Sequence, residues 1–489
     1  MMQLLRTICA ILFLIPLGAS SAQDSERYLI MQIDGERAGW MRESITRSEG
    51  RITSSAETRM SVKRGPIEIS ISFEIEFVET DEYEPISMRS KQVMGALPVE
   101  TSYVFTDQGV EVTTVQSGRT TTRTQPAPDR DWVPPAKAAA IMQNALEEGR
   151  DSVEVTTLDP AFGLVPVTTT RTDIEPASIE VLGKTVPGFR ATSTSSIAPG
   201  STSTEFVDEQ GRLLRSSTTF GGLEITMIAA EKELALADID APEMMQSTFI
   251  SPKGTIRRPR ETTEAVYLLT SSAGPLEDLP QTSSQRVERI DESTLRVRVK
   301  AESFTTEGGT PTDADLASST MVACTDDAIV ALVSRSGAAK NAPASVRAEA
   351  HRRFVHEFID EKSLGVGFAT ASEVARTRVG DCTEHAALLA AVLRADGIPA
   401  RVASGLIYVD SFLGSEKIFG YHMWTRAYID TPDGRRWVDL DATLPDGTPF
   451  DATHITLDES TLSDDDAVNA MIALAPLMGR LEITIESIE

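Results

Sequence analysis

Apolar and polar residues alternate strictly between Ile67 and Phe77. Isoleucine or phenylalanine occupies every odd-numbered position of this segment, and glutamate or serine occupies every even-numbered one. Side chains of a β-strand point alternately to the two faces of a sheet, so all the apolar side chains of this segment share one face. The pattern therefore predicts a half-buried strand of an antiparallel sheet.

The same β character extends over residues 23–255. Further β-rich runs lie at 110–115, 153–158 and 223–228, and one helix is predicted at 136–148, after two prolines and before Gly149. Histidine and cysteine are absent from Gln23 through Thr320. We therefore expect residues 23–255 to form a β-rich scaffold or binding domain. A smaller β-rich segment is predicted at 256–310, with strands at 265–269 and 295–300, and a linker rich in Gly, Thr, Asp and Ser at 305–320.

Charge excludes one class of partner. The 489-residue chain has a formal net charge of -27, and an acidic surface repels the phosphates of nucleic acids. We therefore expect no nucleic-acid partner.

The first residues are typical of an export signal. Arg6 supplies a positive charge, an apolar run follows from Ile8 to Leu17, and Ser20-Ser21-Ala22 fits a small-residue cleavage site. The apolar run is too short to cross a bilayer comfortably, and no other stretch is long enough. We predict a signal peptide at 1–22, a mature chain that begins near Gln23 without a stable membrane span, and an extracytoplasmic location, periplasmic or secreted.

Two cysteines remain once the predicted signal, with Cys9, is removed. Cys324 and Cys382 either form a disulfide, as is common in exported proteins, or Cys382 is a free thiol kept for its chemistry. All five histidines fall between His351 and His454, so proton-transfer chemistry is expected in this part of the chain.

Cys382 opens a predicted helix. The residues from Cys382 to Arg394 are mostly alanine and leucine, Asp381 and Glu384 form a capping-box pattern, and Gly397 with Pro399 ends the helix. The free N–H groups and the dipole at a helix N-terminus stabilise a thiolate. This placement favours a reactive Cys382.

A predicted hairpin supplies a base and a carboxylate. After a buried strand at 400–409 and a flexible stretch at 410–420, His422 lies on a strand at 421–429, and the return strand at 436–440 ends at Asp441. Counting across the turn at 431–434 places His422 and Asp441 at the same end of neighbouring strands. Asp439 shares a strand face with Asp441, so spacing alone leaves either as the partner of His422.

These motifs together resemble the transglutaminase-like superfamily, which shares its core with papain-like thiol proteases. The resemblance rests on three motifs and covers about 346–456: Gly380-Asp381-Cys382-Thr383-Glu384-His385-Ala386, then Arg394-Ala395-Asp396-Gly397-Ile398-Pro399-Ala400-Arg401, then Tyr421-His422-Met423-Trp424 with Trp437-Val438-Asp439-Leu440-Asp441-Ala442-Thr443. It implies a multidomain α+β chain, with the antiparallel β-rich region followed by a transglutaminase-like (papain-like) α+β domain at 321–489.

The resemblance also implies an activity. Cys382 is the nucleophile, His422 its base and Asp441, selected by the family's Asp-x-Thr pattern, the residue that orients the base. The expected enzyme acts on amide or peptide carbonyls of a protein or peptide through a thioester, followed by hydrolysis or transfer to an amine. The alternative is a non-catalytic extracytoplasmic binding or structural protein with an inactive module.

Other features of this region point to no cofactor or metal. His385 follows Cys382 by three residues, but no second pair has zinc-ligand spacing, and a supporting or packing role is expected for His385. The acidic run at 464–466 lacks the alternating ligands of a calcium loop. Family members often supply a Trp, Tyr or Gln upstream of the cysteine to stabilise the oxyanion, and none lies between Gly337 and Asp381.

Overall fold

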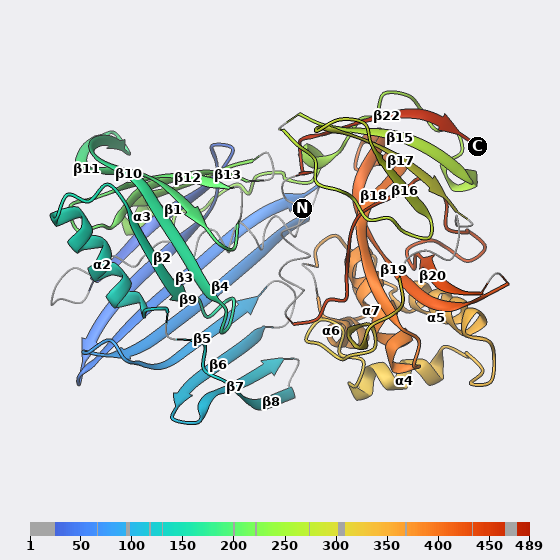
Figure 1. Ribbon diagram of the computed structural model, residues 1–489, viewed down its shortest axis with the longest axis horizontal. Helices are drawn as coiled ribbons and strands as arrows, with labels where there is room; N and C mark the ends of the chain where they lie inside the picture. The colour runs from blue at the N-terminus through green and yellow to red at the C-terminus, as the bar shows by residue number, and fades with distance from the viewer. Residues whose placement is uncertain are drawn as a thin grey trace. The chain divides into compact units, whose positions relative to one another are not determined.

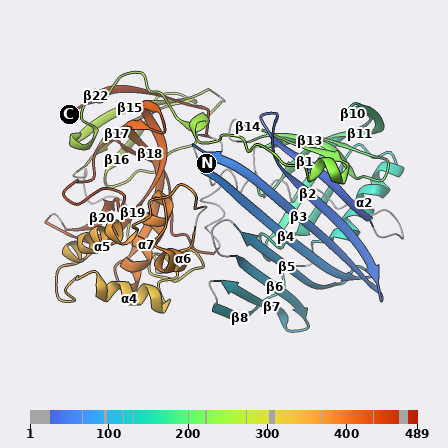
Figure 2. The same cartoon turned by 180° about the vertical axis from the view of Figure 1, so that it is seen from behind.

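The computed structural model describes residues 25–489, apart from 66, 94–97, 117–118, 130, 199–200, 221–222, 273, 302–308, 367–368, 433 and 465–476. The predicted signal peptide at 1–22 and most of the acidic run at 464–466 lie outside these residues. The described chain divides into two compact units, one over residues up to 63 together with 68–242, the other over 64–67 and 243–489. Figures 1 and 2 show both units from opposite sides.

A single large antiparallel sheet forms the first unit (Figure 1). Its spatial order is β8-β7-β6-β5-β4-β3-β2-β1-β14-β13-β12-β11-β10-β9, so nearly all neighbours in space are neighbours in sequence. The strands are β1 (Ser25–Ile33), β2 (Glu36–Ser48), β3 (Arg51–Arg64), β4 (Ile67–Thr80), β5 (Pro85–Val93), β6 (Val99–Thr106), β7 (Gly109–Gln116), β8 (Arg119–Gln125), β9 (Val153–Leu158), β10 (Pro166–Val181), β11 (Lys184–Ser195), β12 (Thr202–Val207), β13 (Leu213–Phe220) and β14 (Leu223–Ala230).

The sheet curves so that strands far apart in its order share a core. Leu158 of β9, at one edge, packs with Phe77 of β4 and with Tyr103 of β6. Helix α2 (Pro135–Glu147) packs its alanines against Ile45 of β2 and Ile52 of β3, and the short helix α3 (Lys232–Ala235) lies against β1. The predicted antiparallel β-rich region is confirmed, including the alternating strand that the structure extends to Thr80.

The second unit contains two four-stranded sheets. One has the order β16-β17-β15-β22 and takes three of its strands from the predicted small segment at 256–310; the other has the order β20-β19-β18-β21. The strands are β15 (Glu264–Ser271), β16 (Gln285–Arg289), β17 (Thr294–Lys300), β18 (Ala400–Phe412), β19 (Ser415–Thr431), β20 (Gly434–Leu440), β21 (His454–Ser460) and β22 (Leu481–Ile488).

Four α-helices of this unit gather beside the second of these sheets (Figure 2). They are α4 (Asp327–Arg335), α5 (Ala344–Phe358), α6 (Ala371–Thr377) and α7 (Cys382–Ala395). Short 3-10 turns lie at η1 (Gln246–Thr248), η2 (Pro259–Glu261) and η3 (Asp313–Asp315). Helix α7 packs on β18 and β19 and contacts the three other α-helices. The alanines and leucines of α7 from Ala386 to Leu393 are all buried, which is why this helix can lie at the centre of the domain.

The predicted flexible stretch at 410–420 is wrong. Strand β18 continues to Phe412 and β19 begins at Ser415, and the two pair closely around a turn at Leu413 and Gly414. Both turn residues have positive φ angles, 48° and 83°, as expected for the tight turn of a hairpin. Buried Ile418 and Phe419 then hold the first part of β19 in the sheet. Within the described ranges, no helix is both long and apolar enough to cross a membrane.

Candidate active site

Cys382 is the first residue of helix α7. The helix is capped as the sequence predicts: Asp381 accepts a hydrogen bond from the N–H of Thr383 at 2.9 Å, and its own N–H donates to Glu384 Oε2 at 2.8 Å. Burial and the adjacent Asp381 carboxylate raise the pKa of Glu384 well above its usual value. Cys382 is partly exposed, and Cys382 and Cys324 are both free thiols. A thiol in this position can reach substrate and faces the positive end of the helix dipole.

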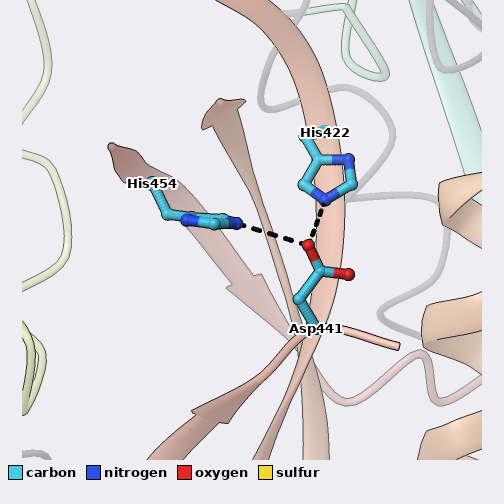
Figure 3. Close-up of side chains that lie close together, drawn as sticks. All are labelled: His422, Asp441 and His454. Atoms are coloured by element: carbon cyan, nitrogen blue, oxygen red, sulfur yellow. Dashed lines mark hydrogen bonds and ion pairs between the residues drawn. The ribbon is translucent and has the colours of Figure 1, made fainter. Parts of the chain in front are cut away.

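His422 and Asp441 are in direct contact. His422 lies on β19, Asp441 follows the last residue of β20, and His422 Nε2 is 2.8 Å from Asp441 Oδ2 (Figure 3). The proximity predicted by counting across the hairpin is therefore confirmed. Because Nε2 faces the carboxylate, the ring presents its other nitrogen, Nδ1, to a different partner.

That partner is Cys382. Burial alone would lower the pKa of His422, but the charge and hydrogen bond of Asp441 together with a hydrogen bond to Cys382 raise it to about 9. A pKa of about 9 favours the charged form of His422 at neutral pH. Burial likewise favours the neutral acid at Asp441, but the adjacent His422 holds the pKa of that carboxyl well below its usual range. Of the three side chains singled out in the sequence, His422 and Asp441 are in direct contact, and Cys382 acts on His422 through its effect on the pKa of the ring.

Helix α5 and a tight turn fix the position of Asp441. Asp441 Oδ1 accepts hydrogen bonds from both the N–H and the hydroxyl of Thr443, each at 2.7 Å, which explains the Asp-x-Thr pattern in physical terms. Arg352 donates to the carbonyl oxygens of Asp441 and Leu444, at 3.3 and 2.8 Å, and His356 donates to that of Ala442 at 3.0 Å. The carboxylate is held from both its backbone and its side chain.

Asp439, the rival carboxylate, makes different contacts. Its Oδ1 accepts from Trp424 Nε1 at 2.8 Å and lies 3.0 Å from Arg426 Nε, and its Oδ2 accepts from the hydroxyl of Ser284 at 2.6 Å. All of these groups are largely buried, so Asp439 holds the sheet together and is not the partner of His422.

His385 lies beneath the helix cap. Its Nδ1 donates to the carbonyl oxygen of Asp381 at 2.6 Å, and burial lowers the pKa of the ring to about 4. His385 is therefore neutral at physiological pH and supports the first turn of α7, in line with the supporting role expected for it.

A second histidine on Asp441 was not foreseen. His454, the first residue of β21, places Nε2 3.3 Å from Asp441 Oδ2, the oxygen that also meets His422 (Figure 3). Its Nδ1 is 3.0 Å from the carbonyl oxygen of Asp451, and the ring is buried against Phe450 and Trp424. The sequence carried one signal for this arrangement: Asp451-Ala452-Thr453, directly before His454, repeats Asp441-Ala442-Thr443.

The His422, Asp441 and His454 side chains have one further chemical capacity. Their three potential ligand atoms lie within 4.8 Å of one another, a spacing at which a metal ion can bind. Hydrogen bonds through protonated nitrogens account for the same distances, so the arrangement requires no ion.

A comparison with known protein families matches the segment of the chain that carries these residues. Residues 332–442 match the transglutaminase-like superfamily, a segment that includes Cys382, His422 and Asp441 and ends before His454. No curated protein matches the chain in sequence.

Three solved structures are similar to parts of the chain. A β-barrel-like protein of a domain of unknown function from Brucella abortus is 12% identical, covering 42% of this chain and 95% of that one, with a TM-score of 0.32. A proposed cysteine protease from Cytophaga hutchinsonii is 17% identical over 47% of this chain and 86% of that one, with a TM-score of 0.28. The periplasmic domain of TgpA from Pseudomonas aeruginosa is 19% identical over 42% of this chain and 76% of that one, with a TM-score of 0.26. At these scores the structural likenesses carry no argument about activity.

Proposed function

From the match of residues 332–442 to the transglutaminase-like superfamily we propose that the chain is an exported thiol enzyme that acts on amide or peptide carbonyls through a thioester on Cys382. The observation that carries the proposal is the 2.8 Å pair of His422 with Asp441, together with the Cys382 side chain as a second partner that raises the pKa of His422. A buried histidine that is charged at neutral pH is what a thiolate needs as its counter-ion.

The proposed reaction begins with the ion pair. The Cys382 thiolate attacks the carbonyl carbon, and the backbone N–H of Cys382, at the free end of α7, donates a hydrogen bond to the developing oxyanion. The C–N bond then breaks, His422 Nδ1 gives its proton to the leaving amine, and a thioester remains. Asp441 keeps Nε2 protonated throughout and so fixes which nitrogen exchanges the proton.

The thioester is resolved by a second nucleophile. His422, now neutral, takes a proton from water or from a primary amine as it attacks the thioester carbon, and the C–S bond breaks to return the thiolate. Water gives hydrolysis, and a lysine-like amine gives a crosslink. A protein or peptide is the proposed substrate, with the β-rich unit as scaffold or binding module and the periplasm or the exterior as the place of action.

Covalent labelling tests the proposal. A thiol-directed alkylating probe, applied at pH 7.5 and read by intact mass, is expected to modify the wild-type chain at Cys382 and to spare Cys382→Ala. Cys324→Ala is the matched control, because Cys324 is buried and its thiol donates to the Leu316 carbonyl oxygen at 3.7 Å. His422→Ala is expected to lose labelling as well. Equal labelling of His422→Ala and wild type would refute the ion pair.

Activity is then sought with two kinds of substrate. Peptides and glutamine-containing proteins are incubated with and without a fluorescent primary amine, and hydrolysis, ammonia release and amine incorporation are each compared with Cys382→Ala. A reactive Cys382 with no turnover of any substrate would favour the alternative of a binding protein with an inactive module.

A further inference from the structure

We propose that His454 is an imidazolium, charged at neutral pH, that shares Asp441 with His422 and acts as a positioning residue, setting the pH range over which His422 and Cys382 form their ion pair. The inference rests on the proposed function for its consequence in catalysis, but the protonation of His454 follows from its own contacts and charged neighbours.

The hydrogen-bond partners of His454 fix its protonation. Nδ1 meets the carbonyl oxygen of Asp451 at 3.0 Å, and a carbonyl can only accept, so Nδ1 carries a proton. Nε2 meets Asp441 Oδ2 at 3.3 Å, and that carboxylate is ionised, so Nε2 must donate as well. A ring with acceptors at both nitrogens is doubly protonated and carries a positive charge.

The surroundings supply the charge balance that a buried cation needs. Besides Asp441, the Asp451 carboxylate lies 3.4 Å from Nδ1, and Arg260 in turn lies 2.9 Å from Asp451 Oδ2. In the described part of the chain, three further rings lie against it: His422, at 5.8 Å between ring centroids, and the uncharged rings of Trp424 and Phe450. The acidic neighbours raise the pKa of His454 to about 9 in spite of its burial.

Charges therefore alternate along one chain of contacts. Arg260, Asp451, His454, Asp441 and His422 follow one another as positive, negative, positive, negative and positive, and the proposed Cys382 thiolate would continue the series. The two histidines compete for a single oxygen of Asp441. The positive charge of His454 therefore cancels part of the negative potential of Asp441, which holds the proton on His422.

A glycine in β18 makes room for this arrangement of rings. Gly405 of β18 pairs with His422 on one side and with Thr456 of β21 on the other. A Cβ at Gly405 would lie 2.9 Å from the Trp424 ring, so the missing side chain makes room for Trp424 to reach across β18. The Trp424 and His454 rings then meet edge to face at 5.3 Å, which keeps the imidazole in line with Asp441.

Replacing His454 by glutamine is expected to move both limbs of the pH profile upward. Two like charges 5.8 Å apart shift each other's titration by about 2 pH units at an effective dielectric constant of about 20. This value is an upper limit, because the site relaxes when the charge is removed, and the expected shift is about 1 pH unit. The sign is fixed, because removing a positive charge makes every nearby group harder to deprotonate.

The first test needs no activity. In the Cys382→Ala protein, ¹⁵N–¹H NMR of the histidine rings at pH 7 is expected to show both nitrogens of His454 protonated. Adding His454→Gln to this protein is expected to raise the titration of His422 by about 1 pH unit. His351→Gln is the matched control, since His351 is equally buried and pairs with Asp396 at 2.9 Å at the other end of α7.

The outcomes separate this inference from the proposed function. A singly protonated His454 at pH 7, or an unchanged His422 titration in the double variant, would overturn the inference even where Cys382 labels normally. If His454→Gln does not fold, the NMR of the single Cys382→Ala variant still decides the protonation. In the chain with Cys382 intact, the pH profile of thiol labelling is expected to shift upward by the same amount, whereas a merely structural His454 would lower its amplitude without moving it.

Discussion

Asp441→Asn removes one negative charge from the cluster and almost no volume. In the wild type, Asp441 Oδ2 faces two imidazole N–H groups and Oδ1 faces the N–H and hydroxyl of Thr443. An asparagine has one acceptor oxygen and one NH₂ group, so in either orientation its NH₂ faces other donors. The substitution therefore costs both charge and hydrogen bonds.

The expected size of the effect follows from the distances. At 2.8 Å and an effective dielectric constant of about 20, the His422–Asp441 attraction has an upper limit of about 6 kcal/mol, or about 4 units of pKa. Relaxation of the site reduces this, and we expect the pKa of His422 to fall from about 9 to about 7 or below. At pH 8 the charged fraction of His422 then drops about tenfold. Breaking the buried pair is also expected to cost about 3–5 kcal/mol of folding stability.

Two assays and one control check this prediction. The second-order rate of thiol labelling at pH 8 is expected to fall at least about tenfold, in line with the lost imidazolium, and urea unfolding gives the stability. Asp439→Asn, two residues away on the same strand face, is the control: it loses its contacts to Trp424 and Arg426 and is expected to destabilise the fold, but to leave labelling of the folded protein unchanged. A wild-type labelling rate in Asp441→Asn, with a tenfold loss in Asp439→Asn, would show that the wrong carboxylate has been assigned.

Three other changes have expected outcomes. His422 and His454 have pKa values of about 9 in the folded chain, against about 6.5 in the unfolded chain, so each contributes stability that is present below pH 6.5 and lost as the pH rises through 9. Between these two pH values, urea unfolding should show the free energy of unfolding fall by about 3 kcal/mol or more. A free energy of unfolding that does not change with pH would contradict this expectation. Gly405→Ala places a Cβ 2.0 Å from the backbone carbonyl oxygen of Ile455, which cannot move aside. Thermal melting should therefore show a loss of folding stability of about 3 kcal/mol, or a chain that does not fold. A wild-type melting temperature would argue against this packing. Arg352→Gln removes the hydrogen bonds to two carbonyl oxygens of the loop that carries Asp441. Thiol labelling should then slow by about tenfold, corresponding to about 1.4 kcal/mol. An unaffected rate would mean that the loop is held by its other contacts.

Local sequence was sufficient where one element fixes the geometry. The alternation at 67–77 predicted a strand because a period of two has no other simple interpretation, and the structure extends that strand without changing its face. The capping box at Asp381 and Glu384 predicted where α7 begins, since both hydrogen bonds lie within three residues. The contact of His422 with Asp441 was predictable for the same reason: the two strands are joined by a tight turn, so counting residues gives the register.

The sequence did not predict the features that depend on pairing between strands far apart in the chain. The stretch at 410–420 was predicted to be flexible, but Ile418 and Phe419 are buried in the sheet. Nor does local sequence show that β21 lies beside β18, which brings His454 within 3.3 Å of Asp441. The order of strands in a sheet is set by the packing of the whole domain and not by any one of its segments.

The repeated Asp-Ala-Thr sequence connects these two cases. In both copies the aspartate accepts hydrogen bonds from the N–H and the hydroxyl of the threonine two residues later, so each copy makes the same turn. The first turn aims a carboxylate at His422, and the second aims the carbonyl of Asp451 at His454, which turns that imidazole toward the first carboxylate. Each turn can be recognised from sequence, but the convergence of the two requires the sheet between them. The candidate site is therefore specified at two levels, with local turns that orient single groups and a strand order that brings the oriented groups together.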